Sequence, residues 1–368
     1  MPIERPLVSV IIPVYNAAPW LSDCIESAMQ SLKGISSEII CVDDGSTDGS
    51  PEILSAFNSA YDGIRVIRQD NAGRSAARNV GIEAARGKWL AFSDADDRLE
   101  PRGFQSMLSK AEFREPDVVF GAARQIGSQT DKSTALVYFD DLMLDSSASQ
   151  RYLLDFAYHA REKNESVGQT ALAAHGQIDL CAVWASLYSG DIVRRNGIRF
   201  VDGLKFGEDT LFNYDFLSHV KSALYISDVV YAQNTSNTGT IRTYHSGDAR
   251  YIGFLFPLWR SRVLRGDCLE ADVASCLARE VMQIAGRIPL SCDEFGEAWS
   301  IAREFSSEWG GCVEPSRVGP ASSAYWPYWK AQYALAKCGG VGFVGLFLLT
   351  RIYASIRGFR KGSSGNVG

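Results

Sequence analysis

The chain has 368 residues, of which 46% are hydrophobic and 22% charged, and its formal net charge is -6. This composition is that of a folded globular protein large enough for two structural units. The acidic net charge argues against a nucleic-acid-binding protein, because phosphate contacts need a basic face. The eight cysteines include no CxxC pair, so the sequence indicates neither a zinc site nor a disulfide framework.

Short apolar strands alternate with amphipathic helices over the first 120 residues or so, at the spacing of βαβ units. We predict strands at Val8–Ile12, Glu38–Val42, Ile64–Ile67, Lys88–Ser93 and Val118–Ala122. We predict helices at Trp20–Leu32, Pro51–Phe57, Ser75–Ala85 and Arg102–Phe113. Fully apolar strands of this kind are typical of a mostly parallel sheet that helices cover on both faces. Ligands in such sheets bind at the carboxyl ends of the strands.

The pattern is weaker after residue 125. We predict helices at Ser146–Lys163, at Asp191–Asn196 and from the end of the loop Gly203–Asp209 to about Leu217, and strands at Val183–Tyr188 and Ala223–Ala232. From about Gly247 onwards the chain reads as mainly helical, and its Gly/Ser-rich end is expected to be disordered. These patterns divide the chain into residues 1–235, with halves 1–125 and 126–235, a helical region 236–361 and a disordered end 362–368.

Two carboxylates, Asp94 and Asp96, follow the apolar run Lys88–Ser93. They are two residues apart, so in extended backbone their side chains leave on the same face. Adjacent like charges are costly unless a cation lies between them, and Mg²⁺ or Mn²⁺ is commonly held by one or two carboxylates. The alternative is a helix N-cap before Pro101, a role for which Asp97 is better placed.

Polar and aromatic side chains also follow the first two predicted strands. Tyr15 and Asn16, after Pro13, are suited to contact a nucleotide, and the alternative is a plain strand-to-helix turn. Asp44 could accept hydrogen bonds from a base N–H or from ribose hydroxyls. Asp48 fits an Asx turn that caps the next helix.

Two further pairs of charged residues lie at predicted helix starts. Arg74 and Arg78 are four apart on one helix face, with no acidic residue at i±4 in that helix. They are either diphosphate ligands or a solvated surface pair. Glu208 and Asp209 follow Gly207. They either stabilise a helix N-terminus or provide a general base for an attacking hydroxyl.

In order and spacing, these motifs resemble the family 2 glycosyltransferases, which have the GT-A fold. The segments that carry the resemblance are Ser9–Asn16, Val42–Asp48, Asn71–Gly81, Phe92–Asp97 and Gly207–Asp209. The resemblance is strong over residues 8–120 and weaker from there to about residue 235. The implied fold is an α/β, Rossmann-like, mixed but mostly parallel sheet flanked by helices, here with a helical C-terminal extension.

The resemblance implies an inverting enzyme that moves one sugar from a nucleotide-diphosphate donor, UDP by family habit, to a hydroxyl of a saccharide or lipid-linked saccharide in surface polysaccharide assembly. Residues 1–125 would bind the donor and residues 126–235 the acceptor. The donor-binding residues carried over are Pro13, Tyr15, Asn16, Asp44, Arg74, Arg78, Asp94 and Asp96. Asp94 and Asp96, the Asp-X-Asp motif, would hold Mn²⁺ or Mg²⁺. Glu208 and Asp209 would be catalytic, with Asp209 as the general base.

The sequence also departs from the family pattern. Processive synthases carry Gln-X-X-Arg-Trp after the base and several long membrane spans, and the sequence shows neither, so we expect transfer of single sugars. His245 is either a further diphosphate or metal contact or an ordinary surface or core histidine. Two other functions stay open. One is a catalytically inactive nucleotide-sugar-binding scaffold. The other is a sugar-phosphate nucleotidyltransferase, which should carry a Gly-rich loop with Arg after the first strand.

The last 48 residues form a basic, aromatic tail. Residues 321–368 carry +6 against a total of -6, so residues 1–320 carry -12. Aromatic rings, the apolar run Val341–Leu349 and the following basic residues suit a segment in the headgroup region of anionic lipid. The alternative is a helix packed on the domain. The N-terminus lacks a signal pattern. We therefore expect a cytoplasmic protein, peripheral on the inner face of the membrane through residues 325–361, and leave a homo-oligomer open.

Overall fold

The computed structural model describes residues 5–126, 141–146, 148–149, 182–204, 207–234 and 248–264. The chain forms two compact units, one of residues 1–153 with 165–237 and one of residues 154–164 with 238–368. In the second unit the described element is helix α9 (Asp248–Leu264). Each described helix is too short or too polar to cross a membrane.

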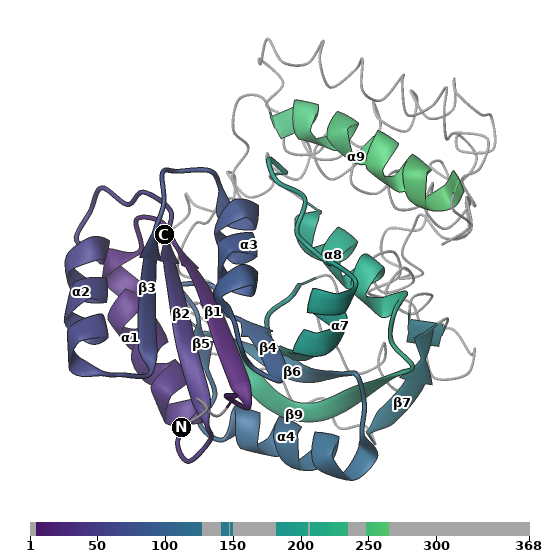
Figure 1. The fold of residues 1–368 in the computed structure, drawn as a ribbon, viewed down its shortest axis with the longest axis horizontal. Coiled ribbons are helices and arrows are strands. Elements are labelled where there is room, and N and C mark those ends of the chain that lie inside the picture. The colour runs from purple at the N-terminus through teal and green to yellow at the C-terminus, as the bar shows by residue number, and fades with distance from the viewer. Residues whose placement is uncertain are drawn as a thin grey trace, which may run out of the picture. The chain divides into compact units, whose positions relative to one another are not determined.

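The first unit is a nine-stranded mixed sheet with helices packed on it (Figure 1). Its strands are β1 (Val8–Val14), β2 (Ser37–Asp43), β3 (Ile64–Arg68), β4 (Trp89–Phe92), β5 (Arg98–Leu99), β6 (Val118–Ile126), β7 (Leu142–Asp145), β8 (Ser186–Ser189) and β9 (Ser222–Asn234). Its helices are α1 (Ala18–Ser31), α2 (Ser50–Ala60), α3 (Arg74–Ala84), α4 (Gly103–Arg114), α7 (Gly190–Arg195) and α8 (Glu208–Leu217).

The strand order is β3-β2-β1-β4-β8-β6-β9-β5, and β7 also pairs with β9. Strands β3, β2, β1 and β4 are parallel, whereas β8 runs antiparallel to β4 and β6. In the parallel part, Val14 of β1 lies opposite Asp43 of β2, and Ile11 lies opposite Phe92 of β4. This register brings the loops after β1, β2 and β4 to the same edge of the sheet.

Strand β1 is buried along its whole length because helices cover both of its faces. Val10 and Ile12 belong to the same core cluster as Leu21 of α1. The intervening residue Ile11 points the other way, to Gly81 of α3, where a Cβ atom would overlap the Ile11 methyl group. Helix α3 therefore lies unusually close to β1, and this contact sets the position of the arginines on α3.

Each predicted helix and strand that lies within the described residues is present, with ends that differ by a few residues. The predicted strand Val183–Tyr188 begins later, at Ser186, because Ala185 has a φ of 57° and Trp184 makes only an isolated bridge with Phe92. Strands β5 and β7 were not predicted. Most of the predicted helix Ser146–Lys163, His245 and the tail from residue 321 lie outside the described residues.

Candidate active site

The loop after β1 and the loop after β2 hold each other at the carboxyl edge of the sheet. The amide N–H of Asn16 donates to Ser46 Oγ at 3.0 Å, and Asn16 Oδ1 accepts the Thr47 N–H at 2.8 Å. Asn16 has a φ of 50°, a conformation that Asn tolerates better than most residues. The side chain of Asn16 therefore has a structural role in this loop. Tyr15 beside it is half-exposed and leaves its ring open to a ligand.

Asp48 occupies the turn position that the sequence predicted. Its carboxylate accepts the Ser50 N–H at 2.9 Å, at the first residue of α2. It also accepts the Ala18 N–H at 3.0 Å, at the first residue of α1. One side chain thus satisfies an unpaired amide at the start of each of two helices.

Asp44 is buried and ties the loop before α3 to the end of β2. Its carboxylate accepts hydrogen bonds from Gln69 Nε2 at 2.7 Å and from the amides of Ala72 and Gly73, both at 2.9 Å. Gly73 has a φ of 92°, which favours glycine, and it immediately precedes α3. Asp44 therefore fixes where α3 begins, a contribution that the motif alone does not reveal.

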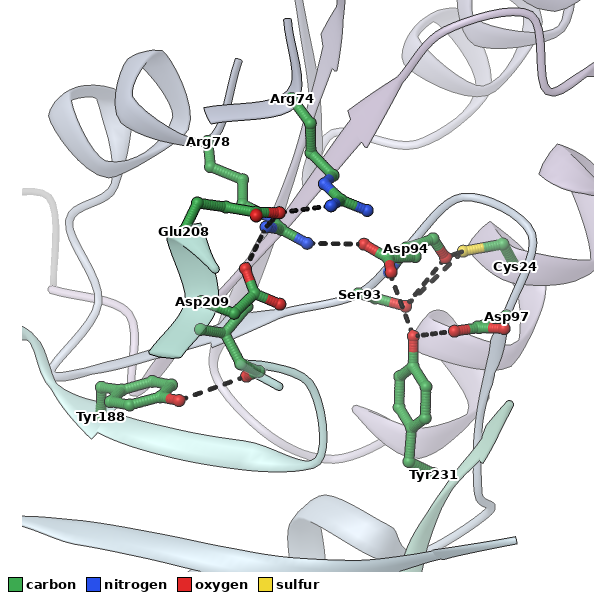
Figure 2. A network of polar contacts seen from close by, with 11 residues as sticks. Cys24, Arg74, Arg78, Ser93, Asp94, Asp97, Tyr188, Glu208, Asp209 and Tyr231 are labelled. Atoms are coloured by element: carbon green, nitrogen blue, oxygen red, sulfur yellow. Dashed lines mark hydrogen bonds and ion pairs between the residues drawn. The ribbon is translucent and has the colours of Figure 1, made fainter. Parts of the chain in front are cut away.

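A buried guanidinium joins two of the predicted site carboxylates (Figure 2). The Arg78 side chain is 1% exposed. Its Nη1 donates to Asp209 Oδ1 at 2.6 Å, and its Nη2 donates to Asp94 Oδ1 at 2.8 Å. Arg74, one turn earlier on α3, pairs with Glu208. The structure thus brings together residues from α3, from the loop after β4 and from the first turn of α8.

The two carboxylates that share Arg78 have opposite pKa shifts. Burial raises the pKa of Asp209 to about 6 in spite of the Arg78 charge, and the neighbouring Glu208 adds to the increase. Burial would also raise the pKa of Asp94, but Arg78 and Arg74 outweigh it and lower that pKa below its ordinary value. Asp94 is therefore an anion suited to a cation, and Asp209 has a pKa suited to accepting a proton near neutral pH.

Asp97 does not cap α4, contrary to the alternative considered for it. Helix α4 begins at Gly103 and has no side-chain cap. Asp97 instead accepts hydrogen bonds from Tyr231 Oη at 2.8 Å and from the Asn234 N–H at 2.6 Å, both on β9. Tyr231 Oη in turn accepts the Asp94 N–H at 3.1 Å. Tyr231, which lies outside the sequence motifs, therefore positions the backbone of Asp94.

The donor set at the end of β4 fits a hard divalent cation. Asp94 and Asp96 supply only oxygen ligands, and both side chains are partly exposed. Among the described residues, no group of three or more His, Cys, Asp or Glu side chains could hold a metal. Two carboxylates leave most of the shell to waters and substrate phosphates, which is the usual arrangement for Mg²⁺. Asp94 and Asp96 would therefore hold a cation that a phosphorylated substrate helps to bind.

Known proteins resemble the part of the chain that carries Asp44, Arg74, Arg78 and Asp94. Residues 9–157 match the family model "Glycosyl transferase family 2". The chain is 30% identical over 242 residues to the uncharacterized glycosyltransferase YibD of Escherichia coli K12, covering 66% of this chain and 65% of that protein. It is 34% identical over 210 residues to the uncharacterized glycosyltransferase EpsJ of Bacillus subtilis 168, covering 56% and 55%. The chain thus spans less than two thirds of either relative.

A solved structure has the same fold. The crystal structure of Staphylococcus aureus TarS 1–349 in complex with UDP-GlcNAc superposes with a TM-score of 0.66 at 16% sequence identity, over 95% of this chain and 91% of that one. This confirms the α/β fold class expected from the sequence. Over residues 9–157 the chain is similar to glycosyltransferase family 2, and it has the GT-A fold.

Proposed function

We propose that this protein is an inverting glycosyltransferase, which moves one sugar from a nucleotide-diphosphate donor to a hydroxyl of a saccharide or lipid-linked saccharide. The observation that carries the proposal is the junction at Arg78, which holds Asp94 on one side and Asp209 on the other. A donor-binding carboxylate and a proton acceptor are thereby adjacent at the ligand-binding edge of the sheet.

Asp209 is the group that we assign to the proton of the acceptor. As the acceptor oxygen forms its bond to the anomeric carbon, the bond from that carbon to the diphosphate oxygen breaks, and Asp209 takes the hydroxyl proton. A positioned base of this kind typically contributes ~10²–10⁴-fold to the rate. The attack comes from the side opposite the leaving diphosphate, so a single displacement inverts the anomeric centre.

The negative charge of the leaving diphosphate is met by two groups. A divalent cation held by Asp94 and Asp96 would neutralise charge on the departing oxygens. Arg74 is the guanidinium that we assign to the diphosphate, because 37% of its side chain is exposed and it lies in the first turn of α3. Helix N-termini favour phosphate groups, which adds to this charge complementarity.

UDP is the nucleotide that we propose for the donor. Its support is the likeness to TarS, whose structures contain UDP-GlcNAc and UDP. The half-exposed ring of Tyr15 is suited to a base, and Asp44 lies at the same edge of the sheet. Asn16 shapes the loop that carries Tyr15, and Pro13 lies near the end of β1, just before this loop.

We further propose that the protein works in surface polysaccharide assembly on the inner face of the membrane, through residues 325–361. Basic and aromatic residues in that segment support membrane contact. Removal of residues 321–368 should release the protein from the membrane fraction of lysed cells. Retention of the truncated protein in that fraction would contradict this part of the proposal.

A thermal-shift screen of nucleotide sugars, each with Mn²⁺ and with EDTA, tests the central proposal. A ligand that binds only the folded state raises stability by RT ln(1 + [L]/Kd), so ~100 Kd of donor adds about 2.7 kcal/mol. The stabilising donor is then incubated with glycan acceptors, and released nucleotide diphosphate is measured. Binding without release would indicate an inactive scaffold. Formation of a nucleotide sugar from a sugar phosphate and a nucleoside triphosphate would indicate a nucleotidyltransferase.

A further inference from the structure

The two arginines of α3 have different surroundings, although both lie on one face of the helix. Arg74 is partly exposed and pairs with one carboxylate, Glu208. Arg78 is fully buried, and both of its terminal nitrogens donate to protein carboxylates. Its Nε is also buried and has no hydrogen-bond partner. Asp94 and Asp209 therefore occupy both terminal nitrogens, and the burial of the whole side chain keeps the remaining Nε away from a phosphate.

An aromatic ring covers the Arg78 guanidinium. The Phe200 ring centroid lies 5.1 Å from Arg78 Cζ, within the range of a cation–π contact. Phe200 in turn stacks on Phe212 of α8, with ring centroids 4.2 Å apart and nearly parallel planes. Arg78 is thus enclosed by the helix that carries Asp209 and by the segment that precedes this helix.

Asn79 fixes the segment that carries this ring. Asn79 Nδ2 donates to the Phe200 carbonyl oxygen, and Asn79 Oδ1 accepts the Phe200 N–H, both at 2.9 Å. The Asn79 amide therefore satisfies both backbone groups of Phe200. Two consecutive residues of α3 thus have related roles. Arg78 holds Asp209, and Asn79 holds Phe200, whose ring covers the Arg78 guanidinium.

We propose that Arg78 is a positioning residue that holds the base Asp209 in place relative to Asp94, with Phe200 and Asn79 as its support, and that it is not a ligand of the donor diphosphate. This inference rests on the proposed function, since it takes Asp209 as the base. Four charged groups influence the Asp209 carboxyl, namely Arg78, Arg74, Glu208 and Asp94. Arg78 opposes the effects of burial and Glu208, so its contact keeps Asp209 ionised at lower pH than the site would otherwise allow.

Arg78→Lys is the most direct test, because lysine keeps the charge but cannot span two carboxylates with a planar fork. We expect kcat to fall ~10–100-fold, while the Kd of UDP measured with EDTA, where no cation links Asp94 to the ligand, changes less than about twofold. Arg74→Ala should do the reverse and weaken UDP binding at least ~5-fold. Arg194→Lys, on α7 and bonded to Asp191 and Gly87, is the matched control and should change neither value. Weakened UDP binding in Arg78→Lys, equal to that in Arg74→Ala, would overturn the proposal.

A double-mutant cycle separates positioning from general structural damage. If Arg78 acts through Asp209, then Arg78→Lys should lower kcat by less than about twofold in a protein that already carries Asp209→Asn. The reason is that the effects of residues that act as a unit are not additive. An equal loss in both backgrounds would overturn the proposal.

Phe200→Leu provides a second variant if Arg78→Lys does not fold. It keeps an apolar side chain but removes the ring over the guanidinium, and should move the acidic limb of the pH–rate profile to higher pH by ~0.5 unit or more. A lower kcat with an unmoved acidic limb would overturn the positioning role. Absence of transfer by the wild type would instead contradict the proposed function, and the UDP affinity of Arg78→Lys would still distinguish a positioning residue from a diphosphate ligand.

Discussion

Asp94 and Asp209, which lie far apart in the sequence, accept hydrogen bonds from one guanidinium, that of Arg78. Asp94 follows β4, and Asp209 lies in the first turn of α8. Their joint contact with Arg78 of α3 sets the separation between the end of β4 and the proposed base.

Asp209→Asn should lower kcat by ~10²–10⁴-fold, because asparagine cannot take the proton of the acceptor hydroxyl. Donor affinity should stay within about threefold, since we assign the diphosphate to other groups. Steady-state kinetics and UDP titration measure the two effects. Asp23→Asn, at an exposed ion pair on α1, is the control. Equal activity of Asp209→Asn and the wild type would remove Asp209 from the mechanism.

The rate should depend on pH through the ionisation of Asp209. Burial raises the pKa of this carboxyl to about 6, and only the ionised form can act as a base. The value of kcat/KM should therefore fall tenfold per pH unit below about pH 6 and level off above it. The acidic limb should disappear in Asp209→Asn. If kcat/KM of Asp209→Asn still falls below about pH 6, another group causes the fall, and the assignment to Asp209 is contradicted.

Glu38→Gln should destabilise the fold without entering the reaction. Glu38 is buried and accepts hydrogen bonds from Ser9 Oγ at 2.7 Å, from the Arg86 N–H at 2.8 Å and from the Arg86 side chain. Hydrogen bonds to a charged group contribute ~1.5–3 kcal/mol, and we expect a loss of that size in the free energy of unfolding. Asp23→Asn, which breaks the exposed ion pair with Arg98, is the control and should lower the free energy of unfolding by less than ~1 kcal/mol.

The effect of Glu38→Gln should also depend on pH. Burial would raise the pKa of Glu38, but its hydrogen bonds with Arg86 and Ser9 outweigh this and lower the pKa. A lowered pKa gives stability that is complete above the unfolded value of ~4.3 and is lost as the pH falls through the folded value. The difference in the free energy of unfolding between the two proteins, measured with denaturant, should therefore shrink progressively as the pH falls below ~4.3. A difference that grows on acidification would contradict the assignment.

Gly81→Ala should destabilise the protein by ~1–3 kcal/mol, because the new methyl group would overlap Ile11 of β1. The displacement of α3 should also lower activity, since α3 carries Arg74 and Arg78. Gly63→Ala is the matched control, with its nearest neighbouring atom at 3.8 Å from the added carbon, and should change stability little. Equal unfolding midpoints for the two variants would contradict the close approach of α3 to β1.

Much of the fold could be predicted from the sequence because its strands are continuous apolar runs that end at acidic or turn residues. Ligands of a parallel sheet bind at the carboxyl ends of its strands. This rule predicts, from the sequence alone, that Asp44 and Asp94 lie at the same edge of the sheet. The strands β5 and β7 escaped prediction because they are short, with two and four residues, and carry little pattern of their own.

The finer arrangement of the site could not be predicted, since it depends on contacts between distant segments. The i, i+4 spacing of Arg74 and Arg78 shows that they share a helix face, but not that one turn separates a partly exposed side chain from a buried one. Likewise, the buried hydrogen bond between Tyr231 and Asp97 joins residues that are 134 positions apart in the sequence. An acidic residue before a helix gives no local sign of such a partner.

Calorimetric titration of UDP into the wild type and Asp96→Asn, each with Mn²⁺ and with EDTA, tests the central claim most directly. The end of β4 is proposed to bind a nucleotide diphosphate through a cation held by Asp94 and Asp96. The wild type should therefore bind UDP at least ~10-fold more tightly with Mn²⁺ than with EDTA, and Asp96→Asn should lose most of this difference. UDP binding that is equal in all four titrations, or absent from the wild type with Mn²⁺, would contradict the account.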